Sequence, residues 1–222
     1  MNTVPGSPSS DIAVTASVKA TQERRGSRSE FADQEAQGGW ATTITPSLAG
    51  FIANIRTCYL ATATASGQPY VQHRGGPPGF LRVLDAQTLG FADFTGNRQY
   101  LSTGNLAENP RAFLFLIDYA RRRRVKLWGT ARTVEDDPDL QRRLLVDSYP
   151  AEAEQAIVFT LEAWDMNCPR HIPAMATEEE VSAMRHPLEL RIGELERENA
   201  ALKAELRRAF SEEDIRLCRS AP

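Results

Sequence analysis

The residues best suited to chemistry lie between Gly96 and Gly129, where cations and amide side chains are concentrated. From Asn97 to Arg132, eight Lys or Arg residues stand against two acidic residues, in a chain whose formal net charge is −3. A nucleic-acid-binding protein is usually basic overall or along a whole face. The local excess therefore predicts a site for one small anion, such as the phosphate of a cofactor, and no nucleic-acid partner.

Two kinds of element position these cations. Asn97 is a good N-cap residue, and Asn109-Pro110 ends a helix, so a short helix is expected from Asn97 to about Glu108. A phosphate near the amides of Arg98 and Gln99 would be stabilised by the N-terminus of this helix. A guanidinium would add charge-assisted hydrogen bonds. A long strand is expected over 123–134, with Arg124, Lys126 and Trp128 on one face. Arg121 and Arg122 are expected at a solvated turn.

Short strands with tight connections surround this segment. At 222 residues, 41% hydrophobic and 25% charged, the chain has room for one domain of about 130–150 residues plus extensions. Thr45-Pro46 is a helix start signal, followed by a short amphipathic helix. Strands are indicated at 58–64, 70–74, 80–84, 89–93, 112–117, 123–134 and 157–164, and a helix over 138–147 forms a lid. This spacing predicts a mainly β protein, an antiparallel barrel with helices.

The two ends of the chain differ from this central part. We expect residues 1–40 to be a flexible extension, 41–175 the barrel domain, 176–210 a helical extension and 211–222 a tail. No run reaches the roughly 18 apolar residues of a membrane span, so the protein is expected to be soluble, without a membrane partner, and cytoplasmic. The three cysteines, Cys58, Cys168 and Cys218, suit neither a disulfide framework nor a metal site.

The helical extension carries a heptad pattern. Thr177 to Glu180 forms a capping box, and a second helix is expected from Pro187. Leu188, Leu195 and Leu202 fall at d positions, and Ile192, Asn199 and Leu206 fall at a positions. This register predicts a short parallel coiled coil over 188–209, in which the buried Asn favours an in-register dimer. The alternative is an amphipathic helix packed on its own barrel.

Motifs in the central part are similar to a known family. Ala61-Thr-Ala-Thr64, Asn109-Pro-Arg-Ala112 and Arg123-Arg-Val-Lys126 resemble the pyridoxamine 5′-phosphate oxidase superfamily of FMN-binding split barrels. Three further stretches, at 72–80, 96–105 and 164–171, resemble its subgroup of predicted flavin-nucleotide-binding proteins. The resemblance implies a six-stranded antiparallel split barrel that is a homodimer, with an FMN at each of two sites across the interface.

The resemblance also implies which residues contact the cofactor. The phosphate would meet Arg98 and Gln99, with Arg124 and Lys126 on the later strand and Gln72 or Arg74 on the earlier one. Gly75 and Gly76 would let backbone approach the flavin ring, unless they form a plain bulge or turn. The full expected cofactor set is Gln72, His73, Arg74, Gly75, Gly76, Asn97, Arg98, Gln99, Tyr100, Asn105, Arg124 and Lys126. Tyr100 and Trp128 could stack on the flavin or pack in the core.

A substrate pocket is expected from the stretch after the last strand. Trp164, Asn167, Cys168 and His171 would form its wall, with His171 as a catalytic proton donor or substrate contact; the alternative is a structural turn. Sequence divergence after His171 argues against true pyridoxamine 5′-phosphate oxidation. Two functions therefore stay open: an FMN-dependent oxidoreductase acting on a small molecule, or a flavin-binding or redox-sensing module without turnover. Relatives that bind a deazaflavin or haem give further cofactor alternatives, although three histidines are few for haem.

Overall fold

The chain divides into two compact units. The computed structural model describes residues 7–147, 149–167 and 170–219. The first unit, Met1–Pro173, contains an antiparallel sheet with helices, and the second, Ala174–Pro222, contains one long helix. The described helices include none long and apolar enough to cross a membrane.

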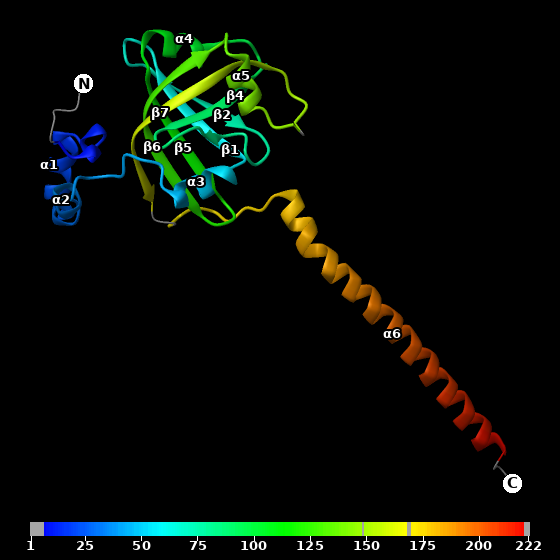
Figure 1. Cartoon of the computed structure of the whole chain (residues 1–222). Helices are drawn as coiled ribbons and strands as arrows, with labels where there is room; N and C mark the ends of the chain where they lie inside the picture. The colour runs from blue at the N-terminus through cyan, green and yellow to red at the C-terminus, as the bar shows by residue number, and fades with distance from the viewer. Residues whose placement is uncertain (1–6, 148, 168–169, 220–222) are drawn as a thin grey trace. The chain divides into compact units, whose positions relative to one another are not determined.

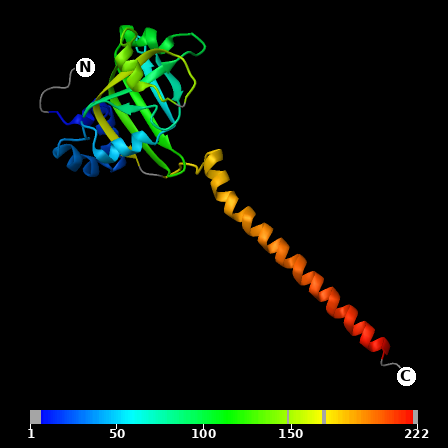
Figure 2. The same cartoon turned by 45° about the vertical axis from the view of Figure 1, so that its right-hand side comes forward.

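The sheet of the first unit is curved and unclosed. Its strands are β1 (Thr57–Ala63), β2 (Pro69–Gly75), β3 (Arg82–Val83), β4 (Thr88–Phe94), β5 (Arg111–Asp118), β6 (Arg123–Val134) and β7 (Ala153–Asn167). They pair antiparallel in the order β2-β1-β5-β6-β7-β4-β3. Two views show the strands wrapping around a common interior (Figures 1 and 2). The strand spacing predicted an antiparallel barrel with helices, and the arrangement is consistent with the split barrel that the family resemblance implied.

The expected number of six strands is wrong. The two-residue strand β3 pairs through Arg82 and Val83 with Gly90 and Leu89 of β4, which adds a seventh strand at the edge of the sheet. The sequence pattern had indicated an extended segment at this place, at 80–84. Of these five residues, only Arg82 and Val83 form a ladder with β4.

Alternation along the strands separates a buried interior from an outer face. On β6, Val125 and Leu127 are fully buried, whereas Lys126 and Trp128 lie on the opposite face, as predicted. On β5, Leu114 and Leu116 are likewise buried. The interior residues form one hydrophobic core, and helix α3 (Pro46–Ala53) contributes Leu48, Phe51 and Ile52 to it. Burial of this apolar surface is the main driving force that holds the curved sheet together.

Two helices begin at side-chain caps, of which the cap at Thr45 was predicted. The Thr45 hydroxyl accepts a hydrogen bond from the Leu48 amide at 3.3 Å, which fixes the start of α3. The carboxylate of Asp137 accepts a hydrogen bond from the Leu140 amide at 2.8 Å, and this bond fixes the start of α5 (Pro138–Leu144). Leu144 of α5 is buried against Ala92 and Ala156, so this helix covers a second, smaller apolar cluster.

The N-terminal segment contains short helical elements. They are η1 (Ser9–Ile12), α1 (Ala16–Arg25) and α2 (Arg28–Ala36), and α1 ends at Gly26, whose φ of 78° suits glycine. Glu35 accepts hydrogen bonds from Arg28 at 2.5 and 2.8 Å and pairs with Lys19 at 3.3 Å. These interactions lower the pKa of Glu35 to about 2, the Arg28 hydrogen bonds being the main cause. The flexibility expected for residues 1–40 stays a prediction.

The second unit is the helix α6 (Glu178–Arg219). Its capping box is confirmed: the Glu180 amide donates to the Thr177 hydroxyl at 3.2 Å, and the Thr177 amide donates to the Glu180 carboxylate at 2.8 Å. The expected start of a separate helix at Pro187 is wrong, because Pro187 lies inside one continuous helix.

Candidate functional site

The candidate site lies at the opening of the barrel, between β2 and β4. Arg74 of β2 donates from Nη1 to Oδ1 of Asp93 on β4. The other oxygen of Asp93 accepts from the side-chain amide of Gln155 on β7 at 2.8 Å. Arg74 Nε is buried and has no hydrogen-bond partner among the described residues. A buried donor without a partner is costly, so this atom marks a place where a bound acceptor would be stabilised.

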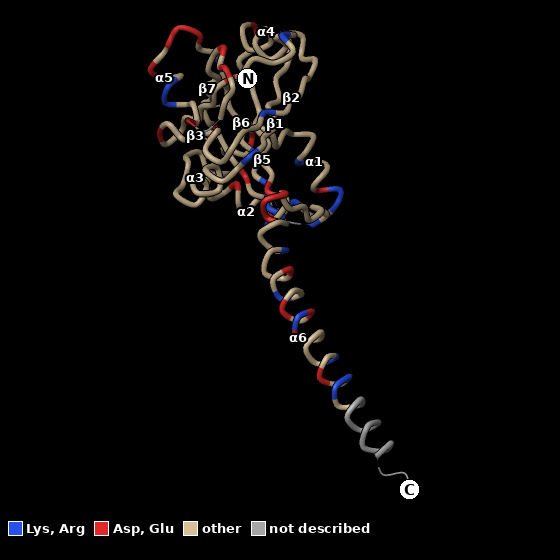
Figure 3. Tube along the Cα trace, turned by 90° about the vertical axis from the view of Figure 1, so that its right-hand side faces the viewer, with Lys and Arg blue, Asp and Glu red and all other residues tan. Residues whose placement is uncertain are grey.

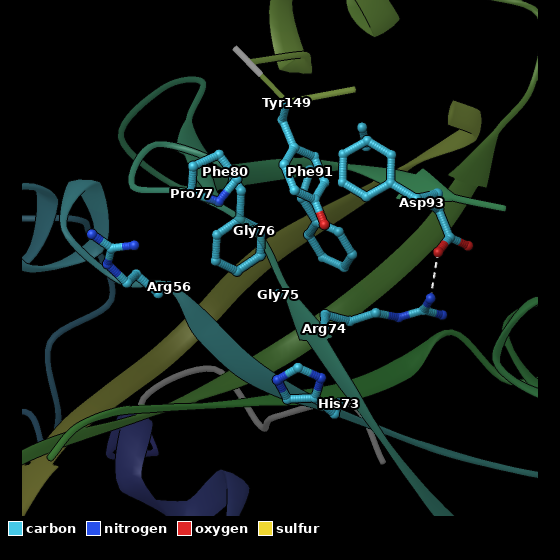
Figure 4. A pocket seen from close by; sticks show the side chains of 12 residues that line it. Arg56, His73, Arg74, Gly75, Gly76, Pro77, Phe80, Phe91, Asp93 and Tyr149 are labelled. Atoms are coloured by element: carbon cyan, nitrogen blue, oxygen red, sulfur yellow. Dashed lines mark hydrogen bonds and ion pairs between the residues drawn. The ribbon is translucent and has the colours of Figure 1, made fainter. Parts of the chain in front are cut away.

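A hollow of about 650 Å³ opens beside this ion pair. Figure 4 shows Phe80 and Phe91 between Arg56 on one side and the Arg74–Asp93 pair on the other. The twelve lining residues are Arg56, His73, Arg74, Gly75, Gly76, Pro77, Phe80, Phe91, Ala92, Asp93, Phe94 and Tyr149. Aromatic walls with a few convergent charges are typical of cofactor and small-molecule sites of this size.

The glycine pair shapes one wall of the hollow. A Cβ on Gly76 would lie 2.7 Å from the Phe80 Cβ, and one on Gly75 would lie 3.1 Å from the Arg56 carbonyl oxygen. The Gly76 amide donates to that same carbonyl at 3.0 Å. Close packing of the chain itself therefore explains both glycines. Because they carry no side chain, they also leave space on this side of the hollow.

A smaller lobe of about 40 Å³ adjoins the hollow and shares Arg74, Asp93 and Phe94 with it. The lobe's other lining residues are Gln72, Gly96, Asn97, Arg98, Tyr100, Ser102, Thr103 and Glu154. Gln72 Oε1 accepts from the Ser102 hydroxyl at 3.3 Å and from the Tyr70 hydroxyl at 3.1 Å. Ser102 and Thr103 lie in the first turn of α4 (Leu101–Glu108). First-turn amides have no partner inside a helix, so they add donors to this lobe.

The expected start of this helix at Asn97 is wrong. Asn97 instead accepts a hydrogen bond from the Gln99 amide at 3.3 Å, and the helix begins four residues later, at Leu101. Arg98 and Tyr100 have φ values of 57° and 53°, in the left-handed region that non-glycine residues rarely adopt. Such strained backbone tends to gather at ligand sites. The Arg98 and Gln99 amides therefore belong to a strained turn before α4.

Arg98 lies at the rim of the small lobe. Its side chain is 70% exposed, and its Nε is 3.9 Å from Oε1 of Glu154. The Tyr100 hydroxyl donates to the same oxygen at 3.4 Å. An exposed ion pair at this distance is weak, so Arg98 is able to exchange Glu154 for an anionic ligand.

Four expected cofactor residues, Gln99, Asn105, Arg124 and Lys126, do not line the hollow or its small lobe. Asn105 is buried and donates from Nδ2 to the Thr62 hydroxyl at 3.0 Å, which ties α4 to β1. Lys126 pairs with Asp165 at 3.3 Å on the outer face of β6. Arg124 lies next to the β5–β6 turn, opposite Ile117. Of the expected set, the structure brings together Gln72, His73, Arg74, Gly75, Gly76, Asn97, Arg98 and Tyr100.

The expected substrate pocket is not gathered around the hollow. Trp164 packs against the core, and its indole N–H donates to the Thr43 carbonyl at 2.9 Å. His171 is exposed, with a φ of 63°. Asn167 is the last residue of β7, opposite Arg124, and Cys168 lies outside the described residues. Trp128 stacks on Trp40 with ring centroids 4.4 Å apart.

Sequence reasoning missed several residues of the site. Asp93 and Gln155 complete the Arg74 network, and Phe80, Phe91 and Tyr149 supply the aromatic wall. An acidic residue in the otherwise apolar strand 88–94 was the available signal for Asp93. The buried Cys58, opposite Arg74 on β1, is no nucleophile, because burial raises the pKa of its thiol to about 12.

The unclosed antiparallel sheet, with a hollow at its open edges, defines a split-barrel protein. The family model described as pyridoxamine 5′-phosphate oxidase matches residues 44–184, and the chain belongs to this family. No curated protein matches the chain.

Several solved structures are similar to this chain at low sequence identity. HupZ from Group A Streptococcus is 18% identical, over 60% of this chain and 99% of its own, with a TM-score of 0.46. A putative pyridoxamine 5′-phosphate oxidase from Lactobacillus delbrueckii is 25% identical, over 56% of this chain and 95% of its own, with a TM-score of 0.42. An FMN-binding protein from Syntrophomonas wolfei is 13% identical, over 67% of this chain and 97% of its own, with a TM-score of 0.46.

Proposed function

We propose that the protein is a homodimeric FMN-binding flavoprotein that acts as an oxidoreductase on a small molecule. Membership of the pyridoxamine 5′-phosphate oxidase family, whose members typically bind a flavin, supports this proposal. The observation that carries it is the pairing of a small polar lobe, which two arginines line, with an aromatic hollow across Arg74. FMN has the same two parts, a phosphate and a flat ring system.

The residues of the small lobe suit a phosphate. Arg98 at the rim and Arg74 at the junction offer guanidinium groups, and the Ser102 hydroxyl and the first-turn amides of α4 offer neutral donors. The Arg74 Nε, which has no hydrogen-bond partner among the described residues, is a further donor for a phosphate. Guanidinium groups bind phosphate through short, charge-assisted hydrogen bonds. Phosphate binding here requires Arg98 to leave Glu154.

The large hollow suits a flat ring. Phe80, Phe91 and Tyr149 would exclude water from one side of it, and the low wall at Gly75 and Gly76 leaves room for backbone to approach. A bound flavin supplies hydride or electron transfer. Of the residues lining the hollow, His73 is of the type that moves protons near neutral pH, and we assign it that role in place of His171, which does not line the hollow.

A second copy would complete the site. Val71 on β2 is 58% exposed, and Tyr59, Phe113 and Phe115 continue this apolar outer face across β1 and β5. An apolar face of this kind fits a protein interface. Arg124 and Lys126, which do not line the hollow of their own chain, would reach the cofactor of the partner across such an interface.

A binding role without turnover is the second candidate. It is favoured by the position of His171, the expected proton donor, away from the lining of the hollow. In this role the flavin would be stored, or would report the redox state.

Two measurements test these proposals in order. Purified protein incubated with FMN and desalted should keep flavin absorption in the visible range, and a protein that keeps none contradicts the cofactor assignment. Anaerobic NADH or NADPH should then bleach the bound flavin if the protein is an enzyme that takes electrons from these donors. Bleaching followed by reoxidation with a small-molecule acceptor supports the oxidoreductase, and a bound flavin that no donor reduces supports the binding role.

A further inference from the structure

The long helix α6 carries a row of exposed apolar side chains along one side. Leu188, Ile192, Leu195, Leu202 and Leu206 are between 47% and 64% exposed. Together with Asn199, they follow one another at alternating steps of four and three residues, which places them on one helical seam. Exposed leucines at this density are unfavourable in water. This seam, defined by the five residues named here and Asn199, is therefore a contact surface.

The helix also needs help from a contact to be stable. Pro187 lies inside it, where it removes a backbone hydrogen bond, and Gly193 lies one turn and a half further on. Both residues disfavour an isolated helix, by about 3 and about 1 kcal/mol relative to alanine. A helix that continues over 42 residues despite both would be stabilised by packing along the seam.

We infer that the seam pairs with the same seam of a second copy of this chain, as a parallel two-stranded coiled coil in register. Ile192 occupies an a position and the leucines at 188, 195 and 202 occupy d positions, the combination that favours two parallel strands. Asn199 is the polar residue of the seam. In a parallel, in-register pair it meets the partner's Asn199 and both amides are satisfied, whereas any other register or an antiparallel pair buries it against leucine.

The charges beside the seam match a second copy. In a parallel pair, the g position of one helix lies next to the following e position of the other. Arg191 therefore meets the partner's Glu196, and Glu198 meets the partner's Lys203, so both pairs are attractive. Within one chain Arg191 pairs with Glu194 at 2.8 Å on the exposed surface, a weak interaction that does not prevent the exchange. Figure 3 shows acidic and basic residues alternating along α6.

The pairing has a consequence for the rest of the chain. A coiled coil that joins two copies raises the effective concentration of one barrel near the other, without any contact between the barrels. Three heptads form only a modest coiled coil by themselves, so the helix would assist an existing dimer of barrels. The coiled coil itself does not depend on the proposed flavin.

Site-directed cross-linking of the full chain tests the inference. In a background with Cys168→Ser and Cys218→Ser, Leu202→Cys places a thiol at a d position, where the two copies face each other. Arg197→Cys, at an f position on the opposite side of the helix, is the matched control. Mild oxidation should convert most of the Leu202→Cys protein to a disulfide-linked dimer and little of the Arg197→Cys protein. Equal cross-linking of the two variants, or none at Leu202→Cys, overturns the inference.

Charge reversal gives a second, independent readout. In the Leu202→Cys background, Arg191→Glu places like charges together and should slow disulfide formation about five-fold. Adding Glu196→Arg restores opposite charges and should restore the rate. If neither substitution alters the rate of disulfide formation, the parallel register is contradicted. A full chain that forms no dimer through α6, because the helix binds another protein, also overturns the inference.

Discussion

Arg74 and Asp93 join two strands that no backbone ladder connects in the described part of the chain. Arg74 lies on β2, at one end of the sheet order, and Asp93 lies on β4, next to the other end. The two-residue strand β3 pairs only with Leu89 and Gly90, so β4 is open on that side at Asp93. The ion pair therefore bridges the opening of the split barrel, with 15% and 10% of the two side chains exposed.

Breaking this bridge should destabilise the barrel. Arg74→Met leaves the Asp93 carboxylate buried with Gln155 as its remaining side-chain partner, and the free energy of unfolding should fall by roughly 3 kcal/mol. Combining Arg74→Met with Asp93→Leu removes the unpaired charge and should recover most of the loss. Urea unfolding of the flavin-free proteins measures both. A loss below about 1 kcal/mol for Arg74→Met would show that the bridge contributes little.

The wall at Gly76 should tolerate no side chain. Gly76→Ala places a methyl group 2.7 Å from the Phe80 Cβ, and the required shift should cost about 1–3 kcal/mol of stability. Gly50→Ala is the matched control, because Gly50 lies in α3 with no atom near its added Cβ, and this change should stabilise by up to about 1 kcal/mol. Thermal unfolding compares the two variants, and a Gly76→Ala protein as stable as the wild type would show that the wall yields easily.

Glu154 should weaken phosphate binding in the wild type. Its carboxylate lies in the small lobe, pairs with Arg98 and repels an anion. Glu154→Gln should therefore tighten FMN binding about three- to ten-fold, with little effect on riboflavin, which has no phosphate. Glu108→Gln removes the same charge at the far end of α4 and should change neither affinity. Fluorescence titration provides all these affinities, and an equal gain for riboflavin would place the effect outside the phosphate lobe.

The N-terminal helices should loosen in acid. Because Arg28 and Lys19 lower the pKa of Glu35 to about 2 from 4.5, the carboxylate stabilises the folded segment fully above pH 4.5. This contribution is lost as the pH falls from about 4.5 toward 2. The protection factors of the α1 and α2 amides, which are corrected for the intrinsic effect of pH on hydrogen exchange, should therefore fall over this window. In Glu35→Gln the exchange should already be fast at pH 6, and an unchanged rate there would contradict the role of Glu35.

Strand alternation predicted most of the sheet. Val125 and Leu127 are buried with Lys126 and Trp128 opposite them, and the ends of β6 agree with the predicted 123–134. Period-two patterns survive in the fold because a shift by one residue would bury the polar face. The pattern also indicated an extended segment at β3, and the count of six strands, which came from the family resemblance, was wrong there.

The candidate site was predictable only in part. Local motifs indicated Arg74 and the residues Asn97, Arg98 and Tyr100, because each motif is a short stretch of the sequence. The partner of Arg74 could not be predicted in this way, since Asp93 is brought near by the curvature of the whole sheet. The helix start was missed for a similar reason: Asn97 has the type of an N-cap, but the left-handed turns at Arg98 and Tyr100 postpone the helix to Leu101.

Comparison of FMN and riboflavin binding tests the central claim most directly. If the small lobe binds the phosphate, the wild type should prefer FMN by about 100-fold or more, and Arg98→Ala should reduce this preference by at least ten-fold. Arg121→Ala, which removes a cation at the β5–β6 turn, should leave the preference unchanged. A wild-type protein that binds FMN and riboflavin equally, or that binds neither, would contradict the assignment of this site.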